Sequence, residues 1–158
     1  MSTKFGSSNI LPFYATLAKI KRKKRMSYTS HWEPDGILCV FSGPLTDEDV
    51  RAANEEFYSD KRSLSCKYQI GDYLNVTDVD ITVEVVREAA RLDKIKSKEV
   101  PGIKVALITT RSVMKGLCRV YELSGGEDAW ETQIFETEAE AREWIGKIAT
   151  IGERVPTP

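Results

Sequence analysis

The sequence contains few of the residues on which metal sites and common catalytic sites depend. It has a single histidine, His31, and three cysteines, Cys39, Cys66 and Cys118, which lie far apart along the chain. Zinc sites use Cys and His ligands a few residues apart, so we expect no metal site. An odd number of cysteines cannot all pair within one chain, and we expect structural thiols. Phosphate-binding and serine-hydrolase motifs are absent from the sequence as well, so we expect no cofactor.

The sequence also lacks any apolar run approaching the roughly 20 residues that cross a bilayer. The apolar stretch from Ile10 to Ile20 precedes its positive charges, the reverse of a secretory signal. We therefore expect a soluble, cytoplasmic protein. At 158 residues, 41% of them hydrophobic, the chain is long enough for one well-formed core.

Acidic residues are missing from the first 25 positions, which hold 7 of the 23 basic residues. Residues 26–158 therefore carry 16 basic against all 24 acidic residues, a net charge of −8. A block of like charge on an oppositely charged body is typical of tails that contact nucleic acid or membrane surfaces. We predict a basic tail over residues 1–25, a domain over 26–150 and a C-terminal tail over 151–158.

The tail has three possible roles. Its apolar residues Ile10, Phe13, Tyr14 and Leu17 recur at helical spacing. An amphipathic helix followed by basic residues binds anionic membranes, with about 1 kcal/mol from each Lys or Arg. Nucleic acid is the disfavoured partner, because no reading motif is present and the acidic body opposes a phosphate backbone. The third possibility is that the tail is an extension without a role. The basic residues concerned are Lys19, Lys21, Arg22, Lys23, Lys24 and Arg25.

Beyond the tail, apolar residues alternate between strand and helix spacing. After a first hairpin, strands alternate with helices, which predicts parallel strand pairs joined by crossovers. The predicted fold class is α/β, a mixed sheet in the order β-β-α-β-α-β-α-β-α. We expect Gly43-Pro44 to end the second strand. The predicted strands cover 28–32, 37–41, 68–74, 104–109 and 130–135, and the predicted helices open at Thr46, Thr82, Ser112 and Thr137.

Short motifs along this order are Trp32–Gly36, Phe41–Thr46, Asp72–Val76, Lys104–Ala106 and Phe135–Trp144. With these motifs the chain resembles the STAS domain, and more closely its SpoIIAA-like branch, over about residues 28–148. The resemblance implies a sheet of about five strands with about four helices mainly on one face. It also implies a non-enzymatic module, which either switches protein partners, as anti-sigma-factor antagonists do, or binds small or lipid-like molecules.

The sequence departs from the classical STAS pattern after the third strand. Classical members carry a phosphorylated Ser there, whereas residues 75–82 contain neither Ser nor Gly. A phosphate on Thr77 or Thr82 would be repelled by Asp78 and Asp80. Switching by phosphorylation is therefore disfavoured.

A candidate ligand site follows from the strand order, because ligands of parallel α/β sheets lie outside the carboxyl ends of the strands. We expect Arg111, at a helix start, to hold a carboxylate or phosphate, and Met114 and Tyr121 to line an apolar slot. The alternative is that Ser112 only caps its helix and Met114 only packs. The predicted ligand-binding residues are Asn75, Thr77, Arg111, Ser112, Met114 and Tyr121.

Two other candidates are weaker. We expect His31 to be structural or at the surface rather than a general base. Asp72, Asp78 and Asp80 could offer oxygens to a cation, but they lack the glycine and final Glu of a calcium loop. The predicted core contains Phe41, Val105, Leu107, Leu117 and Trp144.

Together these patterns predict a non-catalytic, STAS-like regulatory or ligand-binding module. Its expected ligand is a small hydrophobic molecule or an acidic amphiphile. The alternatives are a partner-switching domain that binds another protein, an enzyme that uses the strand ends, and a membrane-peripheral protein held by its tail.

Overall fold

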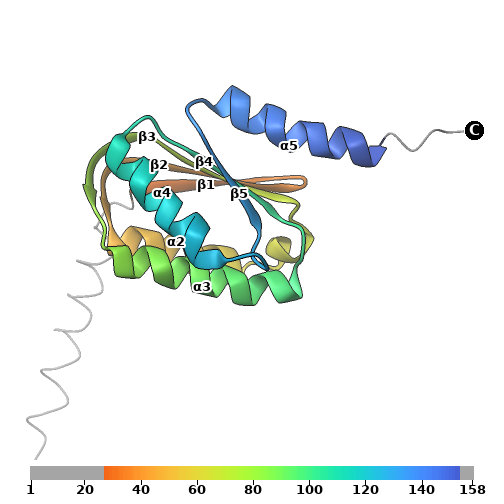
Figure 1. Ribbon diagram of the computed structural model, residues 1–158, viewed down its shortest axis with the longest axis horizontal. Helices are drawn as coiled ribbons and strands as arrows, with labels where there is room; N and C mark the ends of the chain where they lie inside the picture. The colour runs from red at the N-terminus through yellow and green to blue at the C-terminus, as the bar shows by residue number, and fades with distance from the viewer. Residues whose placement is uncertain (1–26, 154–158) are drawn as a thin grey trace, which may run out of the picture.

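The computed structural model describes residues 27–153, and the side chains of residues 27–146 (Figure 1). The predicted basic tail, with its apolar stripe, lies outside the described residues, as do residues 154–158. The predicted order β-β-α-β-α-β-α-β-α is confirmed, with one short 3-10 helix added. The elements are β1 (Tyr28–Glu33), β2 (Gly36–Thr46), α2 (Asp47–Ser59), η1 (Lys61–Ser65), β3 (Tyr68–Asp80), α3 (Val83–Glu99), β4 (Lys104–Ile108), α4 (Ser112–Gly125), β5 (Glu131–Phe135) and α5 (Glu138–Glu153).

The five strands form one mixed sheet in the order β1-β2-β3-β4-β5. β1 and β2 form the predicted antiparallel hairpin, in which Tyr28 lies opposite Phe41. The other three strand pairs are parallel, and each is joined by a helical crossover. No helix in the described part of the chain is long and apolar enough to cross a membrane.

Helices α2, α3 and α4 cover one face of the sheet, and α5 lies on the other (Figure 1). The strands supply both faces by alternation. In β4, Val105 and Leu107 join the large cluster under the three helices, whereas Ala106 and Ile108 join the small cluster under α5. The expected arrangement, with helices mainly on one face, is confirmed.

Most of the predicted core is buried. Phe41, Val105 and Leu107 are at most 8% exposed, in the cluster under the three helices. Leu117 is half-buried against that cluster, and Trp144 is half-buried against the other one. The two faces therefore have separate cores, with the larger one on the side of α2, α3 and α4.

Strands β2 and β3 are longer than predicted, and the expected strand end at Gly43-Pro44 was wrong. β2 continues to Thr46 because Gly43 adopts a φ of 72° and the pairing with β3 shifts register on either side of it. The extension buries Leu45 and Val76, which are 0% and 1% exposed. Burial of these side chains outweighs the local stop signal.

Helix starts mostly follow the predicted caps. Thr46 accepts a hydrogen bond from the backbone of Asp49, whose carboxylate accepts one in return. Thr137 and Glu140 form the predicted reciprocal box. Ser112 is not a cap: the N-cap of α4 is Arg111, and its side chain makes no capping hydrogen bond.

Candidate functional site

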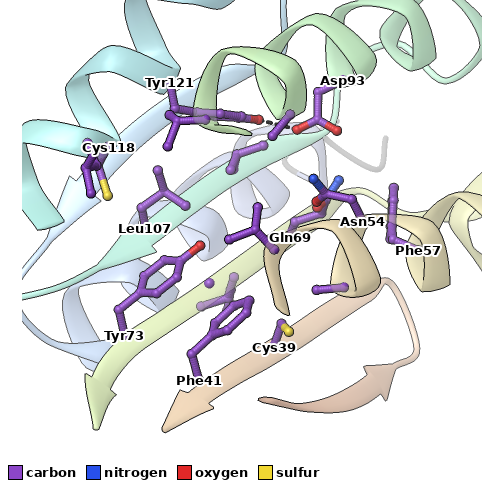
Figure 2. Close-up of a pocket in the computed structure, with 18 of the residues that line it drawn as sticks. Cys39, Phe41, Asn54, Phe57, Gln69, Tyr73, Asp93, Leu107, Cys118 and Tyr121 are labelled. Carbon is purple, nitrogen blue, oxygen red and sulfur yellow. Dashed lines mark hydrogen bonds between the residues drawn. The ribbon is translucent and has the colours of Figure 1, made fainter. Parts of the chain in front are cut away.

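A cavity of about 120 Å³ lies between the sheet and helices α2, α3 and α4 (Figure 2). Strands β2, β3 and β4 form its floor, and the three helices form its walls. Most of the lining is apolar, with Ile37, Phe41, Val105 and Leu107 on the floor. An apolar cavity of about 150 Å³ holds benzene, so this cavity suits a compact organic molecule.

Gln69 is a polar residue in the middle of this floor. It lies in β3, between Ile37 of β2 and Val105 of β4. Its amide nitrogen is buried and has no hydrogen-bond partner among the described residues. An unpaired buried amide costs about 1–3 kcal/mol. Asn54 of α2 lies at the same end of the cavity (Figure 2), so two amides form part of a polar end.

The third polar group at this end is Asp93 of α3, which is 8% exposed. Its carboxylate accepts hydrogen bonds from the hydroxyls of Tyr58 in α2 and Tyr121 in α4. One carboxylate thereby joins three helices. Burial raises the pKa of Asp93 to about 6, although the two tyrosine bonds act in the opposite direction. Asp93 is therefore charged at neutral pH.

The tyrosines stay protonated donors. Burial, reinforced by the charge of Asp93, raises the pKa of both Tyr58 and Tyr121 well above the usual value. Within residues 27–153, no Lys, Arg or His lines the cavity. The polar end therefore carries a negative charge that no positive side chain in the described part of the chain balances.

The opposite end of the cavity is mainly apolar, apart from the Tyr73 hydroxyl, and is shaped by a glycine. A Cβ at Gly71 would lie 3.1 Å from the ring of Tyr73 and 3.3 Å from Leu107, closer than ordinary contact. The glycine lets the Tyr73 ring lie over the strand, where it stacks on Phe41 with ring centres 4.7 Å apart. Figure 2 shows Tyr73 and Leu107 at this end, away from the amides.

Two of the predicted site residues line the cavity. Met114 is 2% exposed, and Tyr121 reaches the wall beside Asp93. Both come from α4, the helix that follows β4.

The other four predicted residues do not line it. Asn75 and Thr77 are exposed in the part of β3 that pairs with β2, because β3 continues to Asp80 instead of ending at Leu74. Arg111 and Ser112 are exposed at the start of α4. Arg111 therefore cannot serve a ligand inside this cavity.

Sequence reasoning missed Asn54, Gln69 and Asp93, although two of them leave a signal. Gln69 is a polar residue within the predicted strand 68–74, on the face shared with buried neighbours. Asp93 lies one turn beyond Ala89, on the buried face of α3. A polar residue at a core position is the signal that both share. Asn54 has no such signal in the helix pattern.

The thiols offer little nucleophilic chemistry. Cys39, Cys66 and Cys118 are free and at least half-buried. Burial raises the pKa of Cys39 and of Cys118 to about 12, and also raises the pKa of Cys66. At neutral pH these thiols are protonated, as structural thiols are.

The remaining candidates lie apart from the cavity. His31 is exposed on β1. Asp72 is buried, Asp78 and Asp80 are exposed, and no group of three metal-binding side chains occurs in the described residues. The Thr82 hydroxyl donates to Asp47 at 2.8 Å, so a phosphate at this position would meet a carboxylate.

Comparisons of the sequence with protein-family models and with curated proteins find no match. Solved structures do match. The unphosphorylated anti-sigma factor antagonist SpoIIAA superposes with a TM-score of 0.52 at 11% identity, covering 75% of this chain and 97% of that one. SLC26A9 matches with a TM-score of 0.52 at 13% identity, over 91% of this chain but only 28% of that one. The chain has the SpoIIAA-like fold of STAS domains.

Proposed function

We propose that this protein is a non-catalytic, STAS-like module that binds a small molecule between its sheet and its three-helix layer. The observation that supports this best is the buried amide nitrogen of Gln69, which has no partner among the described residues and lies on the floor of a cavity of about 120 Å³. Core polar groups are normally hydrogen-bonded. A half-turn of the amide exchanges its nitrogen and oxygen, so Gln69 offers a donor or an acceptor to a molecule in the cavity.

The chemistry of the lining supports binding rather than catalysis. Covalent catalysis needs a nucleophile beside a base. The two thiols in the lining, Cys39 and Cys118, have a raised pKa and are protonated. The single carboxylate, Asp93, is held by two tyrosines. These groups can orient a bound molecule but form no nucleophile–base pair.

The lining also supports a small and largely hydrophobic ligand. Aliphatic and aromatic side chains from every wall face the cavity, and a few polar groups gather at one end. Binding sites commonly combine an apolar lining with a small number of convergent polar groups.

A thermal-shift screen of small organic compounds tests the proposal. A ligand at 100 times its dissociation constant adds about 2.7 kcal/mol of stability. Ala53→Leu, on the cavity side of α2, should fill the space and abolish the shift. Ala52→Leu is the matched control, because Ala52 neighbours Ala53 on the same helix but does not line the cavity, so this variant should keep the shift. If both variants respond as the wild type does, the ligand binds elsewhere, and if no compound shifts the wild type, the proposal is wrong.

A further inference from the structure

We propose that the cavity selects a small organic cation, a primary ammonium on a short apolar chain, with Asp93 as its counter-ion. This inference rests on the proposed function, because it names the class of ligand for the same cavity. It departs from the acidic amphiphile expected from the sequence, whose anchor, Arg111, lies outside the cavity.

The charge balance of the cavity is the first argument. Among the described residues, Asp93 is the only carboxylate in the lining, and none of the lining side chains is basic. Buried charges in proteins are normally paired. Tyr58 and Tyr121 supply hydrogen bonds to the carboxylate but no positive charge. A cationic ligand would complete the pair, whereas a carboxylate ligand would add a second buried negative charge.

Desolvation is the second argument. An ion pair in a protein interior is costly mainly because both ions lose water. Folding has already removed Asp93 from water, since the residue is 8% exposed. Only the ammonium must be desolvated on binding, and it meets a carboxylate that two hydroxyls already hold in place.

The groups around Asp93 can supply the other contacts that a primary ammonium on an alkyl chain makes. It has three donors and no acceptor. The amides of Asn54 and Gln69, at the same end of the cavity, can each present an oxygen. Aromatic faces attract cations, and Phe57 and Tyr121 are part of the lining. The mainly apolar end, at Leu107 and the ring of Tyr73, suits a short alkyl chain.

A matched series on the wild-type protein tests the inference. Butylamine, butanol and butyrate share one carbon skeleton and differ in the charge of the head group. Their dissociation constants are measured at pH 7.5 by NMR titration, following residues that line the cavity. Butylamine should bind at least about tenfold more tightly than either of the others.

Asp93→Asn then measures what the charge of the carboxylate contributes to binding. The substitution keeps the shape of the side chain but removes its charge, so butylamine affinity should fall about tenfold or more while butanol affinity stays the same. Asp72→Asn is the matched control: Asp72 is also 8% exposed but does not line the cavity, so its replacement should leave butylamine affinity unchanged.

The outcomes separate this inference from the proposed function. If butanol or butyrate binds the wild type as tightly as butylamine, the cation preference is wrong and the binding function stands. If none of the three binds but other compounds fill the cavity, the inference alone fails. If no compound of any class binds, both fail. The wild-type series decides the matter even if Asp93→Asn does not fold.

Discussion

The two faces of the sheet are built from the same strands but differ in what they enclose. Under α5, Ile70, Ala106 and Ile108 are at most 1% exposed and pack on Ala141. Under α2, α3 and α4, the same strands enclose a cavity with polar groups at one end. One face is a close-packed apolar core, and the other combines a core with a site.

Single positions in β3 show how this difference arises. Ile70 faces α5, while its neighbours Gln69 and Gly71 face the three helices. One neighbour brings a polar group, and the other brings no side chain. A polar side chain at Gln69 and the lack of one at Gly71 both weaken apolar packing on this central strand. The less tightly packed face, under α2, α3 and α4, is the one that contains the proposed binding site.

Truncation of a core residue on each face is the strongest test of this comparison. Ile108→Ala removes a 0% exposed side chain from the close-packed face and should cost towards the upper end of the usual 2–5 kcal/mol. Leu107→Ala removes a side chain that already borders empty space, so its cost should lie near the lower end. The free energy of unfolding is measured by urea denaturation. Equal costs would show that the two faces pack alike.

Asp93→Asn tests the buried charge of the cavity face. The pKa of Asp93 is about 6 in the folded protein and about 3.9 in an unfolded chain. Between these values only the folded state holds the proton, so this group makes stability fall as pH rises from 4 to 6. The variant should therefore gain about 2 kcal/mol relative to the wild type between pH 4 and pH 7.

Acids with a lowered pKa, such as Glu33 and Asp49, have the opposite effect: their contribution to folding stability is lost as pH falls. Both acids are present in the wild type and in the variant, so their contributions cancel in the difference between the two proteins. Urea denaturation across this pH range makes the measurement. Parallel stability curves for the two proteins would show that Asp93 is solvated rather than buried.

A smaller effect is expected at the edge of the α5 face. Arg142 of α5 donates to both carboxylate oxygens of Glu33 in β1, at 2.9 and 2.6 Å, and is 39% exposed. Arg142→Gln should cost about 1 kcal/mol, because two-point pairs exceed ordinary surface pairs. Arg51→Gln is the control on the cavity side: Arg51 makes a single 3.0 Å contact with Glu88, is more exposed, and should cost less. The midpoints of thermal unfolding compare the two, and an equal loss would contradict the difference.

The sequence predicted elements whose signals are local and missed those that depend on distant partners. Thr46 and Thr137 were recognisable caps because the residues that complete them lie three positions away. The extension of β2 past Gly43 was not predictable, since it depends on pairing with residues about 30 positions later in the chain.

The same distinction applies to the site. Met114 and Tyr121 were predicted to line an apolar slot along the helix that follows Arg111, and both lie in the lining of the cavity. The role of Asp93 could not be predicted, because its partners Tyr58 and Tyr121 come from two other helices. Arg111 was placed in the site by the rule for strand ends, but β3 runs past that edge and the cavity lies beneath the helices.

The smallest effect is expected from removal of residues 1–25. The strands and helices that the structure describes lie within residues 27–153, and Ser27, which donates its backbone N–H to Asp49, is retained. The melting temperature should change by less than about 2 °C, the shift that a few tenths of a kcal/mol gives in a domain of this size. A larger drop would mean that the apolar stripe of the tail packs on the domain.

The same truncation tests the membrane alternative. Seven basic residues would bind anionic vesicles through screened charge, so only the full-length chain should co-sediment with them, and high salt should release it. Vesicles without anionic lipid are the control. Co-sedimentation of the truncated chain would place the contact on the domain instead, where a net charge of −8 over residues 26–158 makes attraction to an anionic surface unfavourable.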